Sequence, residues 1–140
     1  MAELLFRRTG LGGFALSALR TAASAGIVTL FDAVIDPIAV NERRWVWEEP
    51  GTYHGVPAGN FAGWFATAAA IFMPLQASYY RIPPRIDVPP WIWFMPAFGH
   101  CLFLLLCAKV CMERGLRAAG AVGLTASALL TIAGILSLFR

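Results

Sequence analysis

The sequence contains little charge for its size. Only 14% of its 140 residues are charged, whereas an average soluble domain carries about 25%. Hydrophobic residues make up 59% of the chain, and the mean hydropathy is +0.66. A soluble fold of this length has too little surface to place so much apolar side chain. The net charge of +3 is small and scattered, which argues against nucleic acid as a partner. The composition therefore predicts an integral membrane protein whose main partner is the lipid bilayer.

Cysteine and histidine are scarce, and the common cofactor motifs are missing. Cys101, Cys107 and Cys111 lie in one apolar run without a C-x-x-C pair, so we interpret them as small core residues. His54 and His100 are the only histidines, too few for a multi-ligand metal site. The sequence has no P-loop, no G-x-G-x-x-G fingerprint and no D-D-x-x-D diphosphate motif. We therefore expect no required cofactor and no metal.

Long apolar runs predict an all-α membrane protein with four transmembrane helices. Each run is about twenty residues long, enough to cross a hydrocarbon core roughly 30 Å thick. The predicted spans are residues 21–40, 60–80, 91–112 and 118–139, which together form a single transmembrane domain over residues 1–140. An aromatic-rich interfacial loop over residues 41–59 follows the first span. Asn60 is placed to cap the second span.

Small residues predict where helices pack closely. Gly59 and Gly63 form a G-x-x-x-G at the entry of the second span, a pattern that lets two helices approach each other. The fourth span is rich in Gly, Ala, Ser and Thr and has no ionisable residue in its interior. We therefore predict that the fourth span is a packing helix.

Two aspartates inside the first span are the sharpest feature. Asp32 and Asp36 are four residues apart, so on a helix they share one face. A carboxylate inside the membrane is costly and commonly faces a cavity or a partner at a functional site. Pro37 lacks a backbone donor, so the carbonyl of Ala33 loses its usual helical partner. These features predict a wet pocket. The alternative is that the span ends early and both acids lie in solvent at the interface.

The loop over residues 41–59 combines charged and aromatic residues. It contains one pair of arginines and one pair of glutamates, which is typical of an ordinary solvated loop. What this does not explain is the density of Trp45, Trp47, Tyr53 and His54 beside them. Aromatic faces bind extended apolar ligands and stabilise nearby cations. An aromatic belt at the membrane interface explains the tryptophans about as well.

The segment over residues 32–64 resembles a known family signature. It is similar to the membrane carotenoid-biosynthesis proteins that include bacterial carotenoid 1,2-hydratases and the archaeal bisanhydrobacterioruberin hydratase. Their pattern reads D-x-x-x-D-P-x-A, W-x-W, Y-x-G-V-P and N-F-x-G-W, in this order. The matching residues are Asp32, Asp36, Pro37, Ala39, Trp45, Trp47, Tyr53, Gly55, Val56, Pro57, Asn60, Phe61, Gly63 and Trp64. Members of that family are longer, with further helices before the signature, so the resemblance implies a shortened or split member. It also implies location in a bacterial inner membrane, either cytoplasmic or photosynthetic.

The resemblance implies hydration of a terminal double bond of an acyclic carotenoid. Protonation of the alkene gives a tertiary carbocation, which water captures as a tertiary alcohol. A carboxyl group in a low dielectric favours its protonated form, and aromatic rings stabilise a cation. The implied catalytic residues are Asp36 as proton donor and Asp32 or His54 as the group that positions water. The implied substrate-binding residues are Trp45, Trp47, Tyr53, Asn60 and Trp64.

A second interpretation is a non-catalytic carotenoid- or chlorophyll-binding subunit of a larger, photosynthetic membrane complex, with other transmembrane subunits as partners. It is favoured by the short chain, the small-residue helix surfaces and His100, which could ligate the magnesium of a chlorophyll-type pigment. A lone intramembrane histidine more often makes a hydrogen bond between helices. A third interpretation, a small transporter, has the acid pair in its favour but lacks an inverted repeat.

Overall fold

The described part of the chain folds into four long helices. The computed structural model describes residues 13–81, 89, 92 and 94–138. Its helices are α2 (Gly13–Asn41), α3 (Ala58–Arg81), α4 (Phe94–Glu113) and α5 (Arg117–Leu138). All four are long and apolar enough to cross a membrane. The predicted all-α integral membrane fold with four spans is confirmed.

The ends of the helices differ in detail from the predicted spans. Helix α2 begins at Gly13 rather than at residue 21, because the apolar residues before Thr21 continue the same helix. Helix α3 begins at Ala58 rather than at residue 60. Its first turn faces Asp36, near the end of α2. The predicted start of the third span at residue 91 and the predicted end of the fourth at residue 139 lie outside the described residues.

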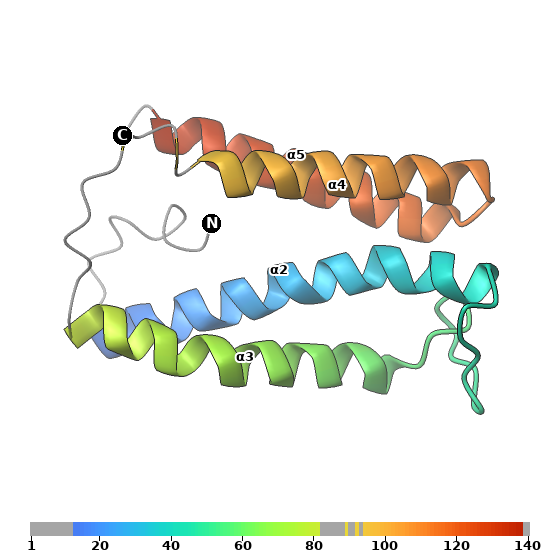
Figure 1. The fold of residues 1–140 in the computed structure, drawn as a ribbon, viewed down its shortest axis with the longest axis horizontal. Coiled ribbons are helices and arrows are strands. Elements are labelled where there is room, and N and C mark those ends of the chain that lie inside the picture. The colour runs from blue at the N-terminus through green and yellow to red at the C-terminus, as the bar shows by residue number, and fades with distance from the viewer. Residues whose placement is uncertain (1–12, 82–88, 90–91, 93, 139–140) are drawn as a thin grey trace.

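The helices form two antiparallel hairpins that lie side by side (Figure 1). Helix α2 pairs with α3, and α4 pairs with α5. Helix α2 also contacts α4 and α5, whereas α3 contacts only α2 among the described helices. Large apolar side chains of α3, such as Ile71 and Met73, are therefore exposed, with 63% and 62% of their surface accessible. In a bilayer such side chains contact lipid, so α2 is the central helix and α3 a peripheral one.

The α4–α5 hairpin is closely packed. A Cβ atom placed on Gly123 of α5 would lie 2.9 Å from the Cβ of Ala108 of α4. Cys101 and Cys111 are buried in this hairpin, and the Oγ of Ser127 donates a hydrogen bond of 3.2 Å to the carbonyl of Cys101. The predictions of α5 as a packing helix and of Cys101 and Cys111 as core residues are confirmed.

The close packing predicted for the glycines of α3 is wrong within the described part of the chain. A Cβ atom on Gly59 or Gly63 would meet no described heavy atom within 4 Å. The buried small residue of α3 is instead Ala68, on a helix whose only described neighbour is α2. The G-x-x-x-G motif therefore makes no close helix contact among the described elements.

The loop between α2 and α3 folds back over the end of its own hairpin. Backbone bridges between Gly51 and Gly55 and between Tyr53 and Val56 form a tight turn in this loop. Gly51 is required there, because a Cβ atom would lie 2.1 Å from the carbonyl oxygen of Val56. The Glu42 carboxylate forms ion pairs with Arg44 and with Arg114, which lies in the turn between α4 and α5. One end of the molecule thus brings together the connecting segments of both hairpins.

Candidate functional site

The acid pair lies inside α2 and is withdrawn from the protein surface. The helix continues through Pro37 to Asn41, beyond both aspartates. Asp32 and Asp36 have only 8% and 4% of their surface exposed. This finding favours the buried interpretation over the one in which the span ends early and the acids lie in solvent. Since the two side chains reach the same partner, described next, the prediction that they share one helix face is confirmed.

Asn60 of α3 joins the two carboxylates. Its Nδ2 donates one hydrogen bond of 2.7 Å to Oδ2 of Asp32 and one of 2.6 Å to Oδ2 of Asp36. A side-chain amide nitrogen carries two hydrogens, so both donors of Asn60 are used by the acid pair. The prediction that Asn60 caps its helix is wrong, because α3 begins at Ala58 and Asn60 lies within its first turn. The Asn60 side chain instead bridges from α3 to α2.

The backbone acceptor released by Pro37 has a partner in the loop. Because proline has no N–H, the carbonyl of Ala33 receives no helical hydrogen bond. The Tyr53 hydroxyl donates a hydrogen bond of 2.9 Å to this oxygen. The Tyr53 ring lies edge-on to Phe61, with ring centroids 5.6 Å apart. Burial raises the pKa of Tyr53 above its ordinary value, so the hydroxyl keeps the proton that it donates.

A cavity of about 280 Å³ lies between the acid pair and the loop. The residues that line it are Asp36, Trp45, Val46, Trp47, Asn60 and Trp64. Five of these were predicted from the sequence, and three are tryptophans. Trp45 and Trp64 are 44% and 46% exposed, so the cavity opens toward the surroundings at this end of the bundle. We refer to it as the tryptophan cavity.

Three predicted residues lie outside the tryptophan cavity. Asp32 does not line it, but shares the hydrogen-bonding amide of Asn60 with Asp36, which does. Tyr53 lines a neighbouring cavity on the α5 side and holds the Ala33 carbonyl. His54 adopts a positive φ of 51°, and its Nε2 is buried without a hydrogen-bond partner in the described part of the chain. The role of His54 in positioning water stays a prediction.

Val46 and Phe61 are not among the site residues that the sequence predicts, although Phe61 belongs to the family signature. Val46 lines the tryptophan cavity between Trp45 and Trp47, and Phe61 packs against Tyr53. An apolar residue carries no chemical signal of its own. The available signal was position, since Val46 is the middle residue of W-x-W and Phe61 follows Asn60.

His100 lies on the other side of α2, on the exposed face of α4. Its ring is edge-on to Phe31, with centroids 5.0 Å apart. Its Nδ1 contacts the carbonyl oxygen of Pro96. A carbonyl oxygen only accepts hydrogen bonds, so Nδ1 is the donor in this contact.

These features define an integral membrane protein with a buried acid pair beneath an aromatic cavity. Residues 3–132 match the sequence model of the family described as carotenoid biosynthesis protein, and the chain belongs to that family. No curated protein and no solved structure matches the chain. The family match confirms the resemblance that the segment over residues 32–64 indicated.

Proposed function

We propose that the chain hydrates a terminal double bond of an acyclic carotenoid by acid catalysis, in a bacterial inner membrane. The observation that carries the proposal is the tryptophan cavity. It combines the Asp36 carboxyl group with three indole rings, in a member of a carotenoid-biosynthesis family. A proton donor and cation-stabilising surfaces are the two things that hydration of an unactivated alkene needs.

In the proposed reaction the Asp36 carboxyl group transfers its proton to the less substituted carbon of the terminal alkene. The π electrons form the new C–H bond and leave a tertiary carbocation, which Trp45, Trp47 and Trp64 stabilise through their ring faces. A water molecule adds its oxygen to the cation and returns one proton to the Asp36 carboxylate. The sum is one water added to one alkene, and the enzyme is regenerated.

Asn60 and Asp32 have supporting roles in this proposal. The hydrogen bonds from Asn60 fix the orientation of both carboxyl groups, which acid catalysis requires. Asp32 lies one helical turn from Asp36 and supplies a second acceptor for the attacking water. His54 is the alternative group for this task. The reaction as written needs no metal or redox cofactor.

The test is expression of the wild type and of Asp36→Asn in a host that accumulates lycopene, followed by chromatography and mass spectrometry of the pigments. We expect the wild type to give a more polar pigment heavier by one water. Loss of a general acid lowers a rate by about 10²–10⁴-fold, so we expect Asp36→Asn to give no detectable product.

Glu113→Gln is the matched control, because it also neutralises a carboxylate but lies in an exposed ion pair with Lys109. It should convert lycopene as the wild type does. Both variants must reach the membrane in equal amounts and elute as monodisperse peaks in detergent. Wild-type conversion by Asp36→Asn would remove Asp36 from the role of proton donor.

A second candidate function is pigment binding without catalysis, and His100 favours it. With Nδ1 at the Pro96 carbonyl, Nε2 is the ring nitrogen that is available to a ligand on an exposed face of α4. Histidines that ligate a metal through one nitrogen commonly have the other nitrogen held by a backbone carbonyl. Purified wild-type protein would then carry a stoichiometric chlorophyll-type pigment, which His100→Phe would lose. Protein from native membranes without such absorbance would contradict this candidate.

A further inference from the structure

The tryptophan cavity is too small to hold a whole carotene. Its volume is about 280 Å³. Pockets that enclose most of a drug-sized ligand have volumes of roughly 300–1,000 Å³, and an acyclic carotene has more atoms than such a ligand. The cavity therefore has room for one end group of the chain, and the rest of the chain must lie elsewhere.

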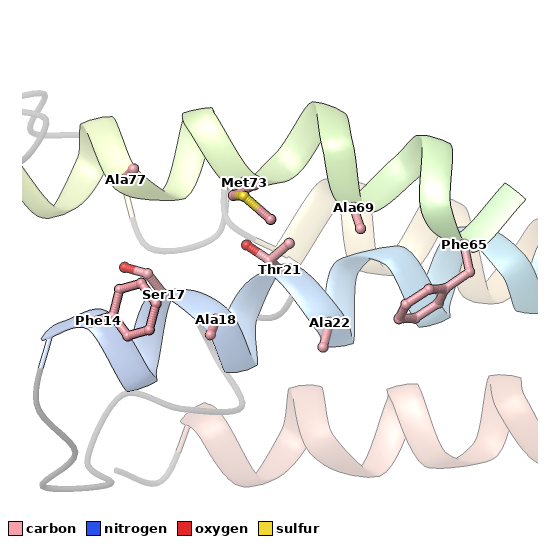
Figure 2. A pocket seen from close by; sticks show the side chains of 9 residues that line it. All are labelled: Phe14, Ser17, Ala18, Thr21, Ala22, Phe65, Ala69, Met73 and Ala77. Carbon is pink, nitrogen blue, oxygen red and sulfur yellow. The ribbon is translucent and has the colours of Figure 1, made fainter. Parts of the chain in front are cut away.

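Three other cavities in the described part of the molecule do not continue the tryptophan cavity. The apolar cavity in Figure 2 is lined by side chains of α2 and α3 and has a volume of about 390 Å³. It shares no lining residue with the tryptophan cavity. The same holds for the two cavities that Leu30 and Ala33 of α2 line together. A chain whose end lies at Asp36 therefore does not extend into any of these three cavities.

The open side of the tryptophan cavity faces lipid at Trp64. This residue lies in α3, about one helical turn after Asn60, and 46% of its surface is exposed. Helix α3 is long and apolar enough to cross the membrane, and it contacts only α2 among the described helices. Its exposed side chains therefore contact the acyl chains of the bilayer. A hydrocarbon chain that enters past Trp64 arrives at Asp36 with its end first.

We propose that the protein recognises only the terminal prenyl unit of its substrate, while the remainder of the chain stays in the bilayer. This inference rests on the proposed function. It widens the substrate class from acyclic carotenoids to any membrane-dissolved polyprenyl chain that ends in the same open-chain alkene, conjugated or not. A protein discriminates between substrates through the contacts that it makes with them, so the part outside the cavity is not selected. A saturated acyl chain that enters the cavity presents no double bond to Asp36 and is not converted.

The chemical step is the same for every member of this class. The proton of Asp36 and the π electrons of the terminal double bond form a C–H bond at the less substituted carbon. The oxygen of water then forms a C–O bond at the tertiary carbon, and this water returns one proton to the Asp36 carboxylate. No bond beyond the last prenyl unit changes, so conjugation along the chain is not required.

The first test compares three substrates in nanodiscs that contain the purified protein. Lycopene and squalene share the open-chain end but differ in length and conjugation, whereas a ring-closed carotene lacks that end. We expect kcat/KM values for lycopene and squalene that agree within about threefold, which corresponds to about 0.7 kcal/mol. We expect no product from the ring-closed carotene. A larger difference between lycopene and squalene, or hydration of the ring-closed carotene, would overturn the inference while the proposed function stands.

Ala69→Leu separates this inference from the alternative in which the chain lies between α2 and α3. Ala69 lines the cavity in Figure 2 and does not line the tryptophan cavity. Leucine would fill part of the cavity in Figure 2, so we expect unchanged kcat/KM for lycopene and for squalene. A loss with either substrate, in a variant that elutes from detergent as the wild type does, would show that the chain lies between the helices and would overturn the inference.

Photocrosslinking tests the inference even if the wild type hydrates neither substrate. Two squalene analogues carry a diazirine, one in the terminal prenyl unit and the other at the centre of the chain. We expect the terminal probe to label residues 45–47 or Trp64, as located by tandem mass spectrometry, and excess squalene to suppress this labelling. The central probe should label lipid and no residue of either cavity. Labelling of either cavity by the central probe, or no labelling of the tryptophan cavity by the terminal probe, would contradict the inference.

Discussion

Pro37 removes one hydrogen bond from α2, and Tyr53 replaces it from outside the helix. The replacement explains why a helix with an internal proline continues to Asn41 with its acid pair buried. It also fixes the loop, because Tyr53 lies in the tight turn that follows Trp45 and Trp47. The hydroxyl of Tyr53 therefore has a positioning role. The substrate-binding role that the family resemblance implies for Tyr53 stays a prediction.

Tyr53→Phe tests this role. Removing the hydroxyl leaves the Ala33 carbonyl without a donor, which costs about 1–3 kcal/mol when the acceptor is buried. We expect a lower unfolding temperature in detergent. The control is Ser78→Ala, because the Ser78 hydroxyl donates to the Leu75 carbonyl in an exposed position and should contribute less than about 0.5 kcal/mol. Equal effects of the two substitutions would show that the Tyr53 hydroxyl has no special role.

At the residue scale the sequence predicts which groups are unusual but not what they bind. Spacing alone places Asp32 and Asp36 on one face, and the chemistry of proline identifies the Ala33 carbonyl as an acceptor without a partner. The partners lie far along the chain, since Tyr53 is 20 residues from Ala33 and Asn60 is 28 residues from Asp32. Those contacts depend on how the loop folds back. Asn60 was consequently predicted as a cap, a local role that any asparagine near a helix start can have.

Helix α5 approaches α4 closely through glycine. Gly123 and Gly134 lie on the same helix, but their surroundings differ. A Cβ atom at position 123 would meet the Ala108 methyl group, whereas one at position 134 would meet no described atom within 4 Å. The same mutation at these two positions therefore separates helix propensity from packing.

Gly123→Ala should destabilise the protein and Gly134→Ala should not. A methyl group at 123 would clash with the Ala108 methyl, and overpacking of this kind costs about 1–3 kcal/mol. At position 134 the added methyl group meets no described atom within 4 Å, and alanine is favoured over glycine in a helix by about 0.5–1 kcal/mol. Unfolding temperatures in detergent measure both effects. Stabilisation by Gly123→Ala would show that α4 and α5 are further apart than described.

At the element scale the sequence predicts the helices well and their contacting faces poorly. Runs of apolar residues identify all four spans, because a bilayer demands about twenty apolar residues whatever their order. The same uniformity hides which side faces protein. The G-x-x-x-G of Gly59 and Gly63 is open, whereas Gly120 and Gly123, three residues apart, are the glycines that approach another helix. Spacing alone does not distinguish these cases.

The two hairpins are linked at one end of the molecule through Glu42. Its carboxylate pairs with Arg114, and this hydrogen bond is the main reason that the pKa of Glu42 is lowered from 4.5. A lowered pKa in the folded protein means that the stabilisation is complete above pH 4.5. It is lost as the pH falls through the pKa of the folded state.

Glu42→Gln should therefore lower the unfolding temperature at neutral pH, and the difference from the wild type should shrink on acidification. Thermal unfolding in detergent over a pH series measures this. Glu113→Gln is the control, because Glu113 pairs with Lys109 inside α4 and joins no separate elements. A Glu42→Gln effect that does not change with pH would show that the ion pair is not its cause.

At the scale of the whole molecule the spatial order of the helices could not be predicted. In a soluble bundle the apolar stripe of each helix indicates the core, but a membrane helix is apolar on every side. Nothing in α3 shows that it contacts only α2, and nothing in α2 shows that it contacts every other described helix. The acid pair was the single useful signal, since buried carboxylates need a polar neighbour, and Asn60 is a polar residue of the adjacent span.

The hydrogen bonds of Asn60 also bear on how the protein is made. The acid pair and its amide partner belong to helices that are consecutive in the chain, α2 and α3. A ribosome completes that hairpin before it synthesises α4, so the two carboxyl groups can meet their donor as soon as α3 enters the bilayer. The most costly side chains for insertion are thus provided for within the first hairpin. The second hairpin has no such group in its buried core among the described residues, and it can dock afterwards through apolar contacts and the ion pair between Arg114 and Glu42.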